Sequence, residues 1–373
     1  MHNHNQHNDH HNHSHPHDHK RHNGDHHHHG AKGLRGWIKA TFHLHGHSHQ
    51  HGALANDQAF VDNSKGICTV WLALIALTVT SVIQILIVLW SGSVALLADT
   101  LHNVGDGLNS IPLLIAFYLA RRVATRRYTY GFGRAEDVAG IFIVLSIAIS
   151  AGVIFWESFQ KFLDPQPITH LNWVAAAAVI GFLGNEAVAL LQIRVGREIG
   201  SAALVADGLH ARTDGLTSLA VLLAVGGTWL GFPILDPIIG ILIGIAILFI
   251  TKDATVTMWY RLMDAIEPEI LHKAEAVVHA QPNIQNVNRL RMRWMGHRLH
   301  AEVCIAVDPQ LTMVESHQIA EELRHNLFHK INNLAEVMVH IDPWSEEPER
   351  FHQLTTHHEP IPEPIPPLPR SPA

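Results

Sequence analysis

Long apolar runs between residues 67 and 251 restrict the fold of this chain more than any other feature. Each run is about long enough to cross the hydrocarbon core of a bilayer, which takes about 20 residues of helix. The runs are Ile67–Trp90, Val94–Ala120, Glu136–Phe159, Trp173–Val195, Ala202–Leu230 and Leu235–Thr251. The sequence therefore predicts an all-α transmembrane domain of six helices over residues 61–255.

Arginines gather in the loops on one side of these spans. They are Arg121, Arg122, Arg126, Arg127 and Arg134 between spans two and three, and Arg194 and Arg197 between spans four and five. The opposite loops hold only Lys161. Because cytoplasmic loops carry the excess of Lys and Arg, both termini are predicted to be cytoplasmic. The N-terminus is rich in His and shows no cleavable signal peptide, so the first span is expected to drive insertion into a bacterial inner (plasma) membrane.

Ionisable residues recur at matched positions in the second and fifth spans. Residues 93–110 align with residues 201–218, and more than half of the positions are identical. Such internal repeats are common in transporters. Each copy holds a His and an Asp four residues apart, which share one face of a helix, with a further Asp three residues before the His. The residues are Asp99, His102 and Asp106 in the first copy, and Asp207, His210 and Asp214 in the second.

These side chains are suited to metal ions. A charged group at the bilayer centre costs about 2.5–3.5 kcal/mol on insertion scales, so a repeated pair indicates a function. Two imidazoles and two carboxylates (His102, Asp106, His210 and Asp214) suit tetrahedral Zn²⁺, and also Co²⁺. Mg²⁺ and Ca²⁺ prefer more oxygen ligands. Metal requires neutral His and ionised Asp, so protons and metal compete for the site. The pattern predicts a proton antiporter that exports divalent metal.

Other polar residues in the spans have open interpretations. Asp99 and Asp207 are expected either to order the ligands and relay protons, or to hydrogen-bond neighbouring helices. Asn185 could face the site, and Glu186 could pair with an arginine. Arg212 lies between His210 and Asp214, and the sequence offers no account of it.

The two ends of the chain are of low complexity. The chain has 33 His, many of them before Ala55, including the run His26–His29. Residues 1–60 are predicted to be a disordered cytoplasmic tail that buffers divalent metal through neutral imidazoles; a solvated tail without that role is the alternative. Residues 346–373 are rich in Pro and are also predicted to be disordered.

Between the last span and the Pro-rich end, residues 256–345 predict a small cytoplasmic α+β domain. Its expected elements are a helix from Pro268 to about Ala280, paired strands Asn288–Trp294 and His300–Val307, a helix Thr312–Ile331 and a strand Val337–Ile341. Cys68 and Cys304 are too few for a disulfide framework and fit a reducing compartment.

Several function classes lack their signatures. The net charge is −7 and no basic patch has interleaved aromatic residues, so nucleic acid is not an expected partner. Neither a phosphate-binding loop of the Gly-x-x-x-x-Gly-Lys-Ser/Thr type nor a His-Glu-x-x-His motif occurs. ATP drive and metalloprotease activity are therefore not expected, and the chain is interpreted as a transporter without a resident cofactor, not as an enzyme.

Over about Ile67–Trp344, the chain resembles the cation diffusion facilitator family of divalent-metal/proton antiporters. The paired His-x-x-x-Asp motifs carry the resemblance. It implies a homodimer in the lipid bilayer, alternating access, and His102, Asp106, His210 and Asp214 as transport ligands of the zinc type. Tyr128 and Phe132 stand where some members have His ligands, so that second site is predicted to be missing.

The resemblance also implies metal ligands in the cytoplasmic domain. They are His340, Asp342, His317 and Cys304. Asn288 replaces a further ligand His of the family, which places a binuclear site in doubt, and Cys304 could instead be a small buried strand residue. The ion could be substrate or regulatory ligand.

Three alternatives remain. A cobalt, nickel or cadmium exporter would use the same mechanism, because ligand type does not rank metals of shared geometry. A membrane metal sensor or store would bind metal without transport, but has no need for matched pairs in the bilayer. An intramembrane metalloenzyme would need an open coordination position, which four ligands do not leave.

Overall fold

The computed structural model describes residues 51–91, 109–163, 170–232 and 234–346, together with Phe351, Leu354 and His358. Within α2 the side chains are described for residues 61–90. The predictions for the His-rich tail before residue 51, and for most of the Pro-rich end, lie outside this range. The described residues belong to one compact unit.

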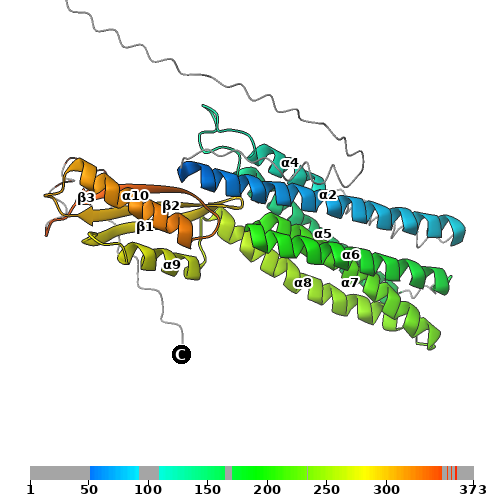
Figure 1. Ribbon diagram of the computed structural model, residues 1–373. Helices are drawn as coiled ribbons and strands as arrows, with labels where there is room; N and C mark the ends of the chain where they lie inside the picture. The colour runs from blue at the N-terminus through cyan, green and yellow to red at the C-terminus, as the bar shows by residue number, and fades with distance from the viewer. Residues whose placement is uncertain are drawn as a thin grey trace, which may run out of the picture. The chain divides into compact units, whose positions relative to one another are not determined.

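Six of the described helices run side by side as a bundle (Figure 1). They are α2 (His51–Ser91), α4 (Ser110–Ala120), α5 (Arg134–Leu163), α6 (Leu171–Ile199), α7 (Ala202–Trp229) and α8 (Leu235–Leu262). Their shared core contains fully buried Phe117 of α4, Ile143 of α5, Leu204 of α7 and Ile247 of α8. Many large apolar side chains on the outer faces are exposed, as expected of helices that face lipid.

Four described stretches are long and apolar enough to cross a membrane: Val61–Trp90, Arg134–Leu163, Leu171–Ile199 and Leu235–Leu262. The second predicted span is described only from Asn109 onward, and its apolar helix α4 is short. α7 is 28 residues long but carries Asp207, Arg212 and Asp214 within its first half. Six spans therefore stay a prediction, although a helical membrane domain is clear.

Two predicted boundaries are wrong. The structure is helical from His51, whereas residues 1–60 were expected to lack structure. The segment contains Ala53, Leu54 and Ala55, which are good helix formers, and α2 begins ahead of its apolar stretch. At the other end of the bundle, α8 continues to Leu262 instead of ending near Thr251, because no Pro or Gly interrupts it after the apolar stretch ends.

Helices α6 and α7 approach each other through glycines. A Cβ added to Gly208 of α7 would lie 2.9 Å from the Ile193 backbone nitrogen, and one added to Gly196 of α6 would lie 2.9 Å from the Val205 nitrogen. Small residues allow such close contact between membrane helices. This approach brings the polar face of α7 against the polar residues of α6.

The C-terminal domain has the predicted order of elements. It consists of α9 (Pro268–His279), β1 (Asn286–Met295), β2 (Arg298–Val307), α10 (Met313–Lys330) and β3 (Leu334–Pro343). The sheet order is β1-β2-β3, with β1 antiparallel and β3 parallel to β2. A capping box of Thr312 and Glu315 begins α10. The helices α9 and α10 contact each other and share one core with the sheet.

The turn between β1 and β2 contacts the start of α5. His297 Nδ1 lies 2.7 Å from Glu136 Oε2, and the Gly296 amide donates to Asp137 Oδ2 at 3.2 Å. His297 and Glu136 are 3% and 1% exposed. Arg134 also pairs with Asp264, which follows α8. Buried polar contacts of this kind join the C-terminal domain to one end of the bundle. The arginine-rich segment 121–134 lies at the same end.

Candidate transport site and metal cluster

The second half of the predicted transport site lies on α7 inside the bundle. His210 and Asp214 are 2% and 6% exposed, and His210 Nε2 lies 3.9 Å from Asp214 Oδ2. In a tetrahedral zinc site, bonds of about 2.0–2.2 Å place two ligand atoms about 3.3–3.6 Å apart. A shift of a few tenths of an ångström would therefore let both atoms bind one ion.

Asn109 is a polar neighbour of His210 that the sequence did not identify. Its Nδ2 lies 2.9 Å from His210 Nε2 and also donates to Ser146 Oγ of α5 at 2.9 Å. The imidazole can accept this hydrogen bond only in the tautomer with a lone pair on Nε2, which is also the tautomer that can bind metal through Nε2. A signal was available, because Asn109 lies three residues after Asp106 and continues its helical face.

Asp207 joins three helices. It is 3% exposed and accepts hydrogen bonds from Ser110 Oγ of α4 at 2.7 Å and from Gln192 Nε2 of α6 at 2.5 Å. Of the two roles predicted for Asp207, hydrogen bonding to neighbouring helices is therefore observed. This bonding also fixes the turn of α7 that carries His210.

The structure shows the neighbours of Glu186, Arg212 and Asn185, whose roles the sequence did not decide. Arg212 Nη2 donates to Glu186 Oε1 at 2.8 Å, so this ion pair links α7 to α6 and accounts for both residues. Asn185 is 5% exposed and lies against Gly215, beside Asp214. The other predicted site residues in the spans, Asp99, His102 and Asp106, lie outside the described residues.

A second cluster lies in the C-terminal domain at the ends of β2 and β3. The ligand atoms of Cys304, His340 and Asp342 lie within 4.8 Å of one another. Cys304 pairs with His340 in the parallel register, and Asp342 follows two residues later on the same face. Cys304 Sγ donates to Asp342 Oδ2 at 2.9 Å, and His340 Nε2 lies 3.0 Å from Asp342 Oδ1.

The remaining predicted ligands of this domain lie elsewhere or are engaged. His317 is exposed on α10 and does not belong to the described cluster. Asn288 donates to Asp342 Oδ2 at 2.9 Å. Burial, and then the hydrogen bond and charge of Asp342, raise the pKa of Cys304 to about 12. The thiol is therefore protonated near neutral pH, and a bound metal would have to displace its proton.

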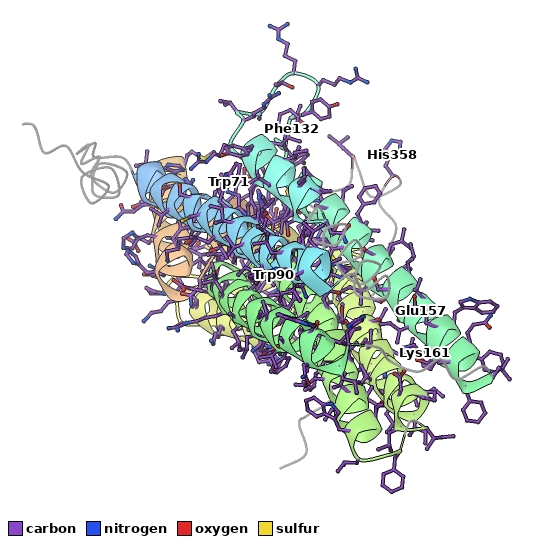
Figure 2. The ribbon with its side chains drawn as sticks, turned by 90° about the vertical axis from the view of Figure 1, so that its right-hand side faces the viewer. Trp71, Trp90, Phe132, Glu157, Lys161 and His358 are labelled. Carbon is purple, nitrogen blue, oxygen red and sulfur yellow. The ribbon has the colours of Figure 1, made fainter. Side chains whose placement is uncertain are left out.

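The segment before α5 has no imidazole at the positions where some relatives of the resembled family have ligands. The rings of Tyr128 and Phe132 contact each other, with centroids 4.7 Å apart. Phe132 and Lys161 lie at opposite ends of α5 (Figure 2). The arginine-rich segment 121–134 and Lys161 are thus at opposite ends of the bundle, as the predicted orientation requires.

Comparisons with known proteins match these two parts of the chain. Residues 70–263 match the family model of the cation efflux transmembrane domain, and residues 266–344 match that of the cytoplasmic domain of cation efflux proteins. The "Probable cation efflux system protein MT2084" of Mycobacterium tuberculosis is 48% identical over 313 residues, which cover 84% of this chain and 93% of the relative.

More distant relatives cover most of the chain as well. The "Cation-efflux pump FieF" of Yersinia pestis is 26% identical over 293 residues, 76% of this chain and 96% of that protein. The "Magnetosome protein MamB" of Magnetospira sp. is 26% identical over 254 residues, 68% and 87% of the two chains. A solved variant of the MamM CTD in a cadmium form covers 21% of this chain and 98% of its own, with 24% identity and a TM-score of 0.20.

Proposed function

This chain belongs to the cation efflux family of integral membrane transporters, and we propose that it exports divalent metal, preferably zinc, in exchange for protons. The observation that carries the proposal is the buried pair His210 and Asp214 on α7, in a bundle with at least four helices fit to cross a membrane. The family transports cations and is not a class of enzymes.

Chain connectivity supports a four-ligand site. Asp106 precedes Asn109 by three residues, so their Cα atoms are at most about 11 Å apart. Asn109 in turn touches His210. The matched motif of the second span must therefore pass close to α7. We infer that His102 and Asp106 complete a His₂Asp₂ site with His210 and Asp214.

Proton coupling follows from the donor set. Metal binds unprotonated imidazole and ionised carboxylate, so each metal ion that enters the site releases protons that were bound there. If the site opens to the two sides alternately, a proton gradient directed into the cytoplasm drives metal outward. Six spans, cytoplasmic termini and an inner-membrane location are part of this proposal, and the arginine distribution supports them.

Zinc is the preferred substrate because nitrogen and oxygen donors in a tetrahedral set suit it, without a thiolate that would hold it too tightly for release. Cobalt, nickel and cadmium compete for the same donors. We also propose a homodimer, which the match to the family's cytoplasmic domain supports. Cys304, His340 and Asp342 would bind zinc there as a regulatory ligand, because their atoms converge. His317, in our proposal, acts only if the partner subunit brings it near such a site.

The test is metal uptake by the full-length protein reconstituted in vesicles with an acidic lumen. His210→Ala and Asp214→Asn should each abolish zinc uptake. The matched control is His272→Ala, an exposed imidazole on α9 of the C-terminal domain with no proposed metal role, which should leave uptake in place. Uptake that persists in His210→Ala would refute the assigned site.

A sensor or store is the second candidate, favoured only by the Cys304 cluster. In that case zinc would bind tightly and no metal would cross the bilayer. Loss of uptake in Asp214→Asn with an active wild type excludes it.

A further inference from the structure

A cavity of about 390 Å³ lies where the bundle meets the C-terminal domain. Its walls come from the end of α6, the start of α7, the last turns of α8, the first turns of α9 and the segment that follows α10. Four cationic side chains line it, and Glu267 is its one lining carboxylate. The cations are Arg197, Arg261, Lys273 and Lys330.

Arg261 and Glu267 already have partners in the wall of the cavity. Arg261 is 7% exposed, lies 4.0 Å from the Trp294 ring centroid and donates to the carbonyls of Gly200 and Gly296. Glu267 accepts a hydrogen bond from Trp294 Nε1 at 2.8 Å and lies 3.9 Å from Arg261. Glu267, the one carboxylate among the described lining residues, therefore already has Trp294 and Arg261 as partners.

The three remaining cations are exposed side chains without a carboxylate partner in the part of the chain that the structure describes. Among the described residues, Arg197, Lys273 and Lys330 form no ion pair, although each lines the cavity from a different helix. The start of α7 at Ser201 adds partial positive charge, because its first amides point toward the cavity end of the helix. Water and salt weaken the repulsion between such exposed cations, and an anion bound between them would turn it into attraction.

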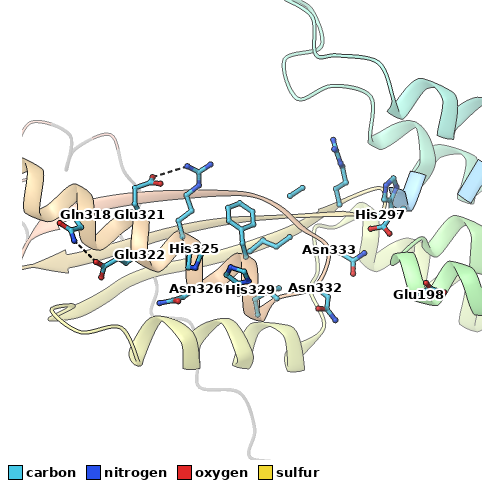
Figure 3. Close-up of a pocket in the computed structure, with 17 residues that line it drawn as sticks. Glu198, His297, Gln318, Glu321, Glu322, His325, Asn326, His329, Asn332 and Asn333 are labelled. Atoms are coloured by element: carbon cyan, nitrogen blue, oxygen red, sulfur yellow. Dashed lines mark hydrogen bonds and ion pairs between the residues drawn. The ribbon is translucent and has the colours of Figure 1, made fainter. Parts of the chain in front are cut away.

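A neighbouring cavity shows that this charge imbalance is local. The larger cavity of about 940 Å³ also reaches residues 331–333, but it is lined by both signs of charge (Figure 3). There Arg324 pairs with Glu321, and Gln318 donates to Glu322. The smaller cavity is therefore distinguished by three cations that form no ion pair with any described residue.

The position of the small cavity at the end of α6 indicates the source of the anion. Arg197 lies two residues before the end of α6, and Arg261 lies one residue before the end of α8. α6 is an apolar span whose predicted membrane segment ends at Val195, so Arg197 and its side of the cavity lie at the level of the lipid headgroups, whereas Arg261 lies beyond the apolar stretch of α8. Basic pockets between helices at this level bind phosphate headgroups.

We propose that this cavity binds the phosphate of an anionic phospholipid through Arg197, Lys273 and Lys330. The phosphate joins a cation of the membrane bundle to two cations of the C-terminal domain, and so holds the domain against the spans. The site does not depend on which metal is carried. A free phosphate has the same chemistry, so the experiment must separate the two sources.

The experiment compares thermal unfolding of the full-length protein in nanodiscs of phosphatidylcholine alone and of phosphatidylcholine with phosphatidylglycerol, at equal ionic strength. The variant is Arg197→Gln/Lys273→Gln/Lys330→Gln. The control is Arg126→Gln/Arg127→Gln, which removes exposed charges from the segment before α5, outside the cavity. Inorganic phosphate in phosphatidylcholine discs is the third arm.

We expect the sign of the variant's effect to change with the lipid. In phosphatidylcholine the triple variant should unfold at the same or a higher temperature than wild type, because repulsion is relieved. With phosphatidylglycerol, wild type and control should gain stability, while the triple variant should not. Its apparent affinity for the lipid should fall at least about tenfold.

Two results would overturn the proposal. One is an equal response of wild type and triple variant to phosphatidylglycerol. The other is stabilisation of wild type by inorganic phosphate with no response to the lipid, which would assign the cavity to a soluble phosphate. If the triple variant fails to fold, Lys273→Arg/Lys330→Arg keeps the charge and must retain the lipid response.

Discussion

Removal of the Asp207 carboxylate should break the hydrogen bonds that join α4 and α6 to α7. Asp207→Ala leaves the Ser110 hydroxyl and the Gln192 amide without their acceptor inside the bundle. A side-chain hydrogen bond between membrane helices contributes about 0.6 kcal/mol on average and at most about 1.7 kcal/mol. Loss of the two hydrogen bonds should therefore lower the free energy of unfolding by about 1–3 kcal/mol. Asp207→Asn keeps an acceptor oxygen and should cost less than about 1 kcal/mol.

The assay is reversible unfolding in mixed micelles, followed by helix content as denaturing detergent is added. Ser110→Ala and the double variant close a mutant cycle, whose coupling energy should match the loss of one contact. Zinc uptake is measured on the same proteins. Asp207→Ala as stable as wild type would refute the structural role, and Asp207→Asn that is stable but inactive would make Asp207 a proton relay instead.

Three further predictions concern packing, pH and metal. Gly208→Ala should cost about 1–3 kcal/mol of unfolding free energy because its Cβ would meet the α6 backbone, whereas Gly226→Ala, with open space, should not destabilise; the same micelle assay checks both. Burial lowers the pKa of His297 and the nearby Glu136 raises it, with a net value above the ordinary 6.5. The pair's stabilisation is therefore full below pH 6.5 and is lost as pH rises through the higher pKa, and His297→Gln should flatten the pH dependence of thermal unfolding there. Cys304→Ala should weaken zinc binding to the full-length protein, measured by calorimetry, without loss of uptake; unchanged binding would contradict the cluster.

The parts that sequence predicted well follow from local patterns. Apolar runs identified the helices α5, α6 and α8, turn signals between paired segments identified β1 and β2, and apolar residues on one helical face identified α10. The His–Asp spacing of four also placed His210 and Asp214 on one buried face of α7. Such features depend on residues close in the chain, and periodicity records them directly.

Contacts between distant segments were beyond the sequence. Asn109 reaches His210 across 101 positions of sequence separation, and although Glu186 was expected to pair with an arginine, its partner Arg212 was not identified. No spacing rule relates such residues. The start of α2 was missed for another reason. The low-complexity composition of the N-terminal tail predicted disorder, although good helix formers follow His51.

The most direct test of the transport claim is uptake of zinc into proteoliposomes whose lumen is more acidic than the outside. Cobalt, nickel, cadmium and manganese are compared in parallel, with Asp106→Ala/Asp214→Ala as the inactive variant and deletion of residues 1–55 as a test of the tail. We predict zinc uptake that requires the proton gradient and both carboxylates, and a tail deletion that only shifts its metal dependence. Uptake that ignores the gradient, or tight zinc binding with no uptake of any metal, would contradict proton-coupled export.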